Sequence, residues 1–251
     1  MPRLIPFRLA LACALALLMS LSIAASAVAK GVSADLRVVG KGGKVLTEQT
    51  LVTGTTAIKT SKKANCFGAG TAGSGKSVTI PGATALGLLG QAAKKTGSLR
   101  PLLITDAFDF GLGICGVGAG KVSGKASWYL KVNHKGATAS GDAVKLKLGD
   151  EVLWDLAPSY PYPNELGLEV PIGVSPGVPF EVKVVSYDEK GKRKPVAGAT
   201  VTGADGPTAA DGKATVTLSA TASLVATHGK DIPSPAEEVC IGAGCPAGPY
   251  K

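Results

Sequence analysis

Residues 127–135 read SWYLKVNHK and residues 144–154 read VKLKLGDEVLW, and these two stretches decide the expected fold. Apolar and polar side chains alternate in both, a pattern typical of β-strands that turn one face to a core. In the first stretch the alternation predicts a core face of Trp128, Leu130 and Val132. Tyr129 and Lys131 are therefore expected on the opposite face of the same strand.

The segments before these stretches predict a hairpin and one helix. Residues 34–39 and 45–52 both alternate and are separated by a glycine-rich turn, which indicates two antiparallel strands. Residues 84–95 predict a helix, with Thr84 as its N-cap and two lysines near its C-terminal end. Further strands are expected at residues 127–132, 144–148 and 152–156. Hairpin, helix and strands together predict an α+β domain over residues 30–157.

The C-terminal half predicts a second domain of different class. Residues 158–175 are rich in proline, tyrosine and glycine, and they are expected to form a connector. Residues 176–251 contain short strand-like segments separated by turn signals, without a helical period. The expected strands lie at residues 180–187, 200–201, 214–218, 223–226 and 238–241. A small all-β sandwich follows from this pattern.

Residues 1–29 have the organisation of a cleaved export signal. Arg3 and Arg8 precede an apolar run, and Ala27-Val28-Ala29 fits the cleavage rule, so cleavage is expected before Lys30. An uncleaved anchor is the alternative, but the run is shorter than the roughly 20 residues that span a bilayer. We therefore expect a secreted or cell-surface bacterial protein, without a transmembrane segment after cleavage.

Four cysteines remain after the signal, and an even number in an exported chain predicts disulfides. Three connectivities are possible. Pairing Cys66 with Cys115 and Cys240 with Cys245 is favoured, since each pair then lies within one expected domain. A zinc site is the alternative, but a C-x4-C spacing with His228 upstream is poor for it. No metal or other cofactor is predicted from these residues.

The charge balance is basic, but it does not indicate a nucleic-acid-binding protein. Removal of Arg3 and Arg8 with the signal lowers the formal net charge from +9 to +7. Nearly all the remaining cations are lysines, whereas base recognition favours arginine and aromatic residues, which are scarce here. Weak attraction to anionic wall polymer stays possible, and a monomer is expected.

Three sequence motifs imitate catalytic signatures. Residues 70–77 match the P-loop pattern, but a β-branched run follows instead of a helix. Residues 111–116 match a dinucleotide-binding pattern, and residues 109–111 copy the kinase metal triplet, without the rest of either site. Asp106 and Asp109 could form an acid pair, yet nothing else supports glycosidase chemistry. His134 and His228 lack a nucleophile motif, so we predict that the protein is not an enzyme.

The two opening stretches resemble the paired motifs of the transcobalamin-like C-terminal domain family. That family has a W-x-Y/L-x-V-N-G-K strand and turn followed by an L-K-x-G-D-x-V-x-W hairpin, and here His134 replaces its glycine. The resemblance implies a β-grasp-like fold and, by analogy with animal carriers, binding of cobalamin or a related corrinoid. Candidate ligand-binding residues are then Trp128, Tyr129 and Asn133. Structural roles in the core and turns are the alternative for all three.

Residues 195–201 and 210–216 are similar to segments of bacterial immunoglobulin-like or carboxypeptidase-regulatory-like modules, which usually act as spacers or adhesive units. The leading functional hypothesis is therefore an exported, non-catalytic binding or surface-interaction protein. Capture of a small corrinoid-like ligand and a structural role in the cell wall are the two alternatives. Either an unknown small ligand or a cell-surface polymer is the expected partner.

Overall fold

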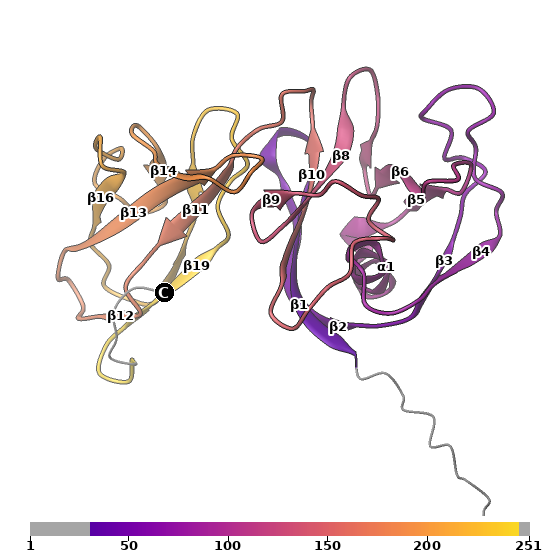
Figure 1. Ribbon diagram of the computed structural model, residues 1–251. Helices are drawn as coiled ribbons and strands as arrows, with labels where there is room; N and C mark the ends of the chain where they lie inside the picture. The colour runs from indigo at the N-terminus through magenta and orange to yellow at the C-terminus, as the bar shows by residue number, and fades with distance from the viewer. Residues whose placement is uncertain (1–30, 246–251) are drawn as a thin grey trace, which may run out of the picture. The chain divides into compact units, whose positions relative to one another are not determined.

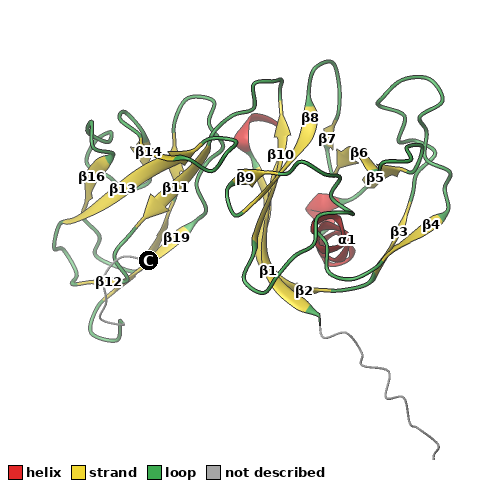
Figure 2. Cartoon of the chain, viewed as in Figure 1, coloured by secondary structure: helices red, strands yellow, loops and turns green. Residues whose placement is uncertain are grey.

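The computed structural model describes residues 31–245, and the expected export signal with its cleavage site lies outside this range. Helix, strands and loops are shown in Figures 1 and 2. Among the described residues, no helix is both long and apolar enough to cross a membrane.

A five-stranded mixed sheet dominates the N-terminal half (residues 31–157). Its order is β2-β1-β10-β8-β9. The strands span β1 Val32–Val39, β2 Val45–Thr53, β8 Ser127–Val132, β9 Lys135–Gly136 and β10 Glu151–Ala157. β1 and β10 are parallel, and the other neighbours are antiparallel. The hairpin predicted from residues 34–52 and the strand at 127–132 are thus confirmed.

One α-helix, α1 (Ala85–Lys95), packs on the apolar face of this sheet. Figure 1 shows it between β1–β2 and the pair β3–β4. The Thr84 hydroxyl accepts a hydrogen bond from the Gly87 amide at 3.0 Å, so the predicted N-cap is confirmed. The sheet contributes alternate residues to this first core, among them Leu36, Leu130 and Trp154.

Short strands complete the N-terminal half. β3 (Thr56–Lys59) pairs with β4 (Ser77–Ile80), while β5 (Leu102–Thr105), β6 (Gly113–Val117) and β7 (Gly120–Lys121) form a separate sheet. Two 3-10 turns lie at Lys41–Gly43 and Gly97–Leu99. The strand expected at residues 144–148 does not form, since this segment makes only an isolated bridge between Lys145 and Thr84.

The C-terminal half (residues 158–245) is built from strands alone among its described residues. One sheet has the order β11-β13-β14, with β16 also paired to β13, and others are β12-β19-β17 and β15-β18. The bounds are β11 Glu165–Glu169, β12 Gly173–Val174, β13 Phe180–Tyr187, β14 Arg193–Pro195, β15 Thr200–Val201, β16 Lys213–Val216, β17 Ala222–Leu224, β18 Ala226–Thr227 and β19 Glu237–Ile241. Their inward side chains form a second core that includes Leu166, Val184 and Val239. β11 and β12 lie inside the segment expected to be an irregular connector.

The prediction of an α+β, β-grasp-like N-terminal domain is wrong. The chain is mostly β, with 42% of its residues in strands and 8% in helix, and α1 is the one α-helix of the described residues. Its strands form several small sheets in addition to the five-stranded one. Glycine and loop segments interrupt the chain between residues 59 and 127, and this keeps most strands there at two to five residues. An all-β sandwich remains a plausible description of the C-terminal half.

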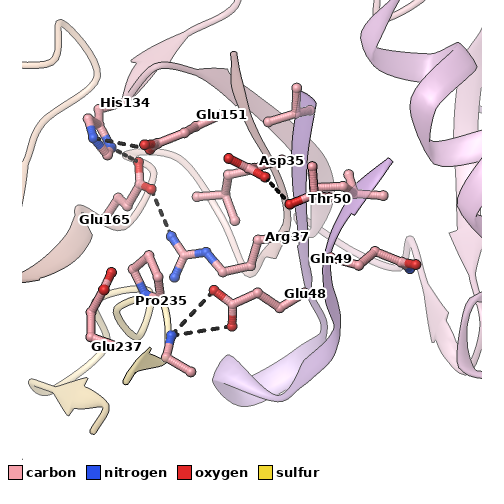
Figure 3. A pocket seen from close by; sticks show the side chains of 14 residues that line it. Asp35, Arg37, Glu48, Gln49, Thr50, His134, Glu151, Glu165, Pro235 and Glu237 are labelled. Carbon is pink, nitrogen blue, oxygen red and sulfur yellow. Dashed lines mark hydrogen bonds and ion pairs between the residues drawn. The ribbon is translucent and has the colours of Figure 1, made fainter. Parts of the chain in front are cut away.

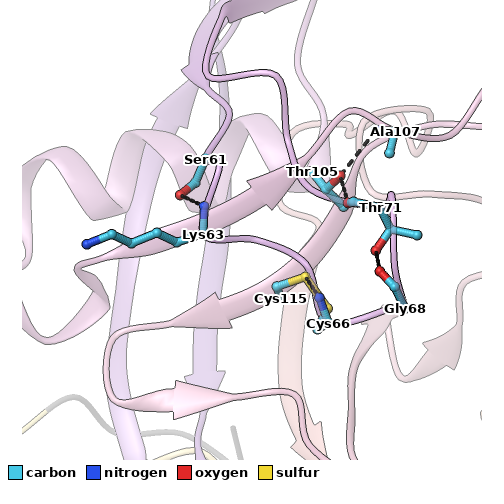
Figure 4. Close-up of a disulfide and its surroundings, with 8 residues drawn as sticks. All are labelled: Ser61, Lys63, Cys66, Gly68, Thr71, Thr105, Ala107 and Cys115. Carbon is cyan, nitrogen blue, oxygen red and sulfur yellow. Dashed lines mark hydrogen bonds between the residues drawn. A yellow bond between two sulfur atoms is a disulfide. The ribbon is translucent and has the colours of Figure 1, made fainter.

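Two disulfides join the four cysteines in the connectivity favoured from the sequence. Cys66 and Cys115 are bonded across a separation of 49 residues, and Cys240 and Cys245 across five. The first bond ties the glycine-rich loop after β3 to strand β6 (Figure 4). Such bonds are consistent with a protein that resides in an oxidising, extracellular environment.

Candidate functional site

The face of the central sheet that points away from α1 carries charged side chains that are buried. The ladder places Arg37 of β1, Leu153 of β10 and Lys131 of β8 side by side, and Asp155 follows two residues later on β10. Glu165, at the start of β11, reaches these residues from the C-terminal half. We call Arg37, Lys131, Asp155 and Glu165 the charged seam, and each is at most 6% exposed.

Glu165 holds the two cations of the charged seam together. Arg37 Nη2 donates to Glu165 Oε1 at 2.7 Å, and Lys131 Nζ lies 3.4 Å from Oε2. The guanidinium also donates to the Pro233 carbonyl, and the Lys131 ammonium donates to the Tyr187 carbonyl at 3.1 Å. The cations therefore join the sheet both to a carboxylate and to two backbone segments of the C-terminal half.

Burial shifts the proton affinities within the charged seam. It raises the pKa of Asp155 to about 7, against the lowering effect of Arg37 and Lys131. Burial also lowers the pKa of the Lys131 ammonium despite the nearby Glu165 carboxylate. For Glu165, burial raises the pKa, but His134, Arg37 and Lys131 outweigh burial and hold that pKa below its ordinary value. Asp155 is thus the seam carboxyl that gains or loses a proton near neutral pH.

His134 extends the charged seam to the surface. It lies in the turn between β8 and β9 with φ of 66°, a left-handed conformation that glycine adopts more readily. Its ring stacks on Tyr187 with centroids 3.8 Å apart, and Nδ1 lies 3.2 Å from Glu165 Oε2. Despite this close approach, neither buried atom has a hydrogen bond of good geometry within residues 31–245. Contacts of the ring thus hold a bulky residue in the backbone conformation of a glycine.

A pocket of about 610 Å³ opens beside Glu165 and His134 (Figure 3). We call it the acidic pocket, because five carboxylates line it: Asp35, Glu48, Glu151, Glu165 and Glu237. Arg37 and His134 are the cationic or ionisable basic groups of the lining. Figure 3 shows Gln49 extending away from the carboxylates.

The outer carboxylates of the acidic pocket are held by hydrogen bonds or ion pairs. Asp35 accepts from the Thr50 hydroxyl at 2.5 Å, and both Glu48 oxygens lie 3.3 Å from the Ala236 amide that donates to them. Glu151 Oε2 lies 3.5 Å from His134 Nε2. Asp35, Glu48 and Glu151 keep lone pairs that these contacts do not use, so they can accept hydrogen bonds from a cationic ligand.

The structure does not bring Trp128, Tyr129 and Asn133 together in one site. Trp128 packs against the first core, with its buried Nε1 lacking a hydrogen-bond partner among the described residues. Tyr129 lies on the opposite face and stacks on Tyr162 with centroids 3.8 Å apart. Burial, with smaller effects of Glu189 and Tyr162, raises the pKa of Tyr129 to about 12.

Asn133 makes turn-closing hydrogen bonds. Its Nδ2 donates to Asp150 at 2.9 Å, and its Oδ1 accepts from the Glu151 amide at the same distance. Asn133 also has a positive φ of 50°, so it and His134 occupy the two left-handed positions of a hairpin turn. These contacts give Asn133 a structural role in joining the turn to the start of β10.

The residues of the imitated catalytic motifs lie in loops and strands. Residues 70–77 run into strand β4 instead of a helix, and the Ser74 amide and hydroxyl both donate to Asp106 at 2.6 Å. His228 Nδ1 lies 2.9 Å from Asp231. Within residues 31–245, no group of three histidine, cysteine, aspartate or glutamate side chains is placed to hold a metal ion.

Sequence reasoning missed Arg37, Lys131 and Glu165 as site residues. Lys131 was expected on the polar face of its strand, which is correct, but a polar face gives no indication that another segment covers it. Arg37 offered the better signal, since it is one of three arginines after the expected cleavage site.

Comparison with known proteins finds no matching family model, no similar curated protein and no similar solved structure. The resemblance to the transcobalamin-like family therefore stays a prediction from the sequence motifs.

Proposed function

We propose that this protein is an exported, non-catalytic binding protein whose acidic pocket takes a small organic cation with primary or secondary amines. The observation that carries the proposal is the convergence of five carboxylates in one pocket of a chain with a formal net charge of +9. Clustered like charges raise one another's energy, and a bound cation relieves this repulsion.

The charged seam supports the proposal because two of its residues, Arg37 and Glu165, line the acidic pocket. Arg37 and Lys131 neutralise Glu165, whereas Asp35 and Glu48 form no ion pair within residues 31–245 and can attract a cation. Glu165 is 4% exposed, and its Oε2 already lies 3.4 Å from Lys131 Nζ and 3.2 Å from His134 Nδ1. A ligand amine is therefore expected to bind the outer carboxylates of the acidic pocket.

A binding role also agrees with how the ionisable groups are held. Hydrogen bonds to Thr50 and to the Ala236 amide engage Asp35 and Glu48, and stacking on Tyr187 fixes the His134 ring. These groups are arranged as a fixed recognition surface, and within the described part of the chain no hydroxyl or thiol is hydrogen-bonded to the His134 ring.

Calorimetric titration with spermidine and cadaverine tests the proposal. We expect binding that weakens as salt is added, because exposed carboxylates supply most of the attraction. Glu48→Gln combined with Glu237→Gln should lower the affinity at least tenfold. Glu238→Gln is the matched control, since the neighbouring Glu238 is exposed and does not line the acidic pocket.

Cobalamin titrated in parallel separates this proposal from the corrinoid hypothesis. Heat released by cobalamin, with none from either amine, would favour corrinoid capture and contradict the amine proposal. Equal amine binding by the wild-type protein and the double Gln variant would also contradict it.

A further inference from the structure

We propose that a second pocket, at the opposite end of the charged seam, binds a small amphipathic anion. The pocket has a volume of about 560 Å³ and is distinct from the acidic pocket. Asp155 lines it, and so do residues of the loops after β1, β7 and β18. We call it the lysine pocket, because Lys41, Lys121 and Lys230 contribute to its lining.

The lining of the lysine pocket separates charge from apolar surface. All three lysines are exposed, so their ammonium groups remain hydrated and available to an anionic group. Buried Leu156 and Ile232 supply apolar surface. Three prolines add to it, Pro158, Pro163 and Pro233. A ligand with one anionic group and an apolar body matches this division.

Asp155 adds a polar group to the lining. It is 5% exposed, and no side-chain hydrogen bond of its carboxyl occurs within the described part of the chain. The other acid of the lining, Asp231, is engaged by His228 at 2.9 Å. A ligand hydroxyl or amide that reaches Asp155 would supply a partner to this carboxyl.

The charge on Asp155 decides how well an anion is tolerated. Arg37 faces it from β1, Lys131 from β8 and Glu165 from β11, while the lining adds three lysines, His228 and Asp231. Burial places the pKa of Asp155 at about 7. Protonation below that pH removes a negative charge from the pocket and creates a hydrogen-bond donor. Anion binding should therefore strengthen as the pH falls through neutrality.

The test uses the full mature chain and the fluorescent probe 8-anilinonaphthalene-1-sulfonate, which combines a sulfonate, aromatic rings and an N–H donor. We expect saturable binding that decanoate displaces. Lys121→Gln combined with Lys230→Gln should weaken probe binding at least fivefold. The control Lys125→Gln changes an exposed lysine outside the lining and should leave binding unchanged.

The pH profile provides the second readout. If the protonated form of Asp155 is the binding form, affinity should be about tenfold higher at pH 6 than at pH 8. Asp155→Asn should bind with nearly the same affinity at both values, whereas His228→Gln should retain the dependence. Absence of probe binding, binding unaffected by the double lysine variant, or an unchanged profile in Asp155→Asn would each overturn the proposal. These results do not depend on amine binding in the acidic pocket.

Discussion

Replacing Glu165 with glutamine should destabilise the protein far more than loss of an ordinary surface ion pair. Glutamine keeps the shape of the side chain, so the change removes charge without opening a cavity. It leaves Arg37 and Lys131 buried without the carboxylate that now lies 2.7 and 3.4 Å from them. Removal of one partner from a buried ion pair costs about 3–5 kcal/mol.

The response of Asp155 should keep the destabilisation by Glu165→Gln near the lower end of this range. Glu165 contributes to the raised pKa of Asp155, so its loss should let Asp155 ionise more readily and compensate part of the unpaired positive charge. We therefore expect a loss of about 3 kcal/mol in the free energy of unfolding at pH 7. With a urea m-value of about 2–3 kcal/mol/M, the unfolding midpoint should fall by about 1–1.5 M.

Urea denaturation followed by tryptophan fluorescence and by far-ultraviolet circular dichroism measures this loss. Glu181→Gln is the matched control, because it breaks an exposed ion pair with Lys213 at 3.0 Å. Such a pair contributes about 0–1 kcal/mol, so the control midpoint should barely move. Adding Lys131→Met to Glu165→Gln should recover part of the loss, since it removes one unpaired cation. A loss below 1 kcal/mol for Glu165→Gln would refute the buried-seam reasoning.

Three further predictions concern Asp155, the two disulfides and the N-cap of α1. Because the pKa of folded Asp155 lies above its unfolded value, the stabilisation by its proton is lost as the pH rises toward 7. Between pH 5 and 7.5 the free energy of unfolding of Asp155→Asn, measured with urea, should therefore rise by about 2–3 kcal/mol relative to that of the wild type. A difference between the two proteins that stays constant with pH would contradict this. Replacing Cys66 and Cys115 with alanine should lower the free energy of unfolding by about 4 kcal/mol, because their disulfide closes a loop of 49 residues. Removing the Cys240–Cys245 disulfide, which closes a loop of five residues, should lower it by about 2 kcal/mol. Equal shifts in melting temperature for the two changes would count against the loop-length argument. Thr84→Ala should cost about 1 kcal/mol through loss of the α1 cap, whereas Thr84→Ser should cost less in the same denaturation assay.

Local signals in the sequence predicted the elements that depend on local interactions. α1 begins one residue after its predicted cap, because Thr84 and the lysines at the other end act within single turns. The strand at residues 127–132 was also predicted with its faces correctly assigned. In both cases the evidence lay within a dozen consecutive residues.

Features that depend on distant segments could not be predicted in the same way. Residues 144–148 alternate as a strand would, but a strand also needs a neighbouring strand to pair with, and only an isolated bridge forms there. Glu165 lies 128 residues from Arg37 in the chain, so no local pattern links them. The burial of Lys131 follows from the segment that covers its face, which its own strand does not specify.

The central claim is that the acidic pocket binds an organic cation, and NMR titration of the ¹⁵N-labelled protein with spermidine tests it most directly. The Ala236 amide donates to Glu48, and the His134 ring lies between Glu151 and Glu165, so both report on carboxylates of the acidic pocket. We predict that the largest saturable shifts occur at Ala236, Thr50 and His134. Shifts spread over exposed acids outside the pocket, such as Glu181 and Glu238, or no shifts at all, would contradict the claim.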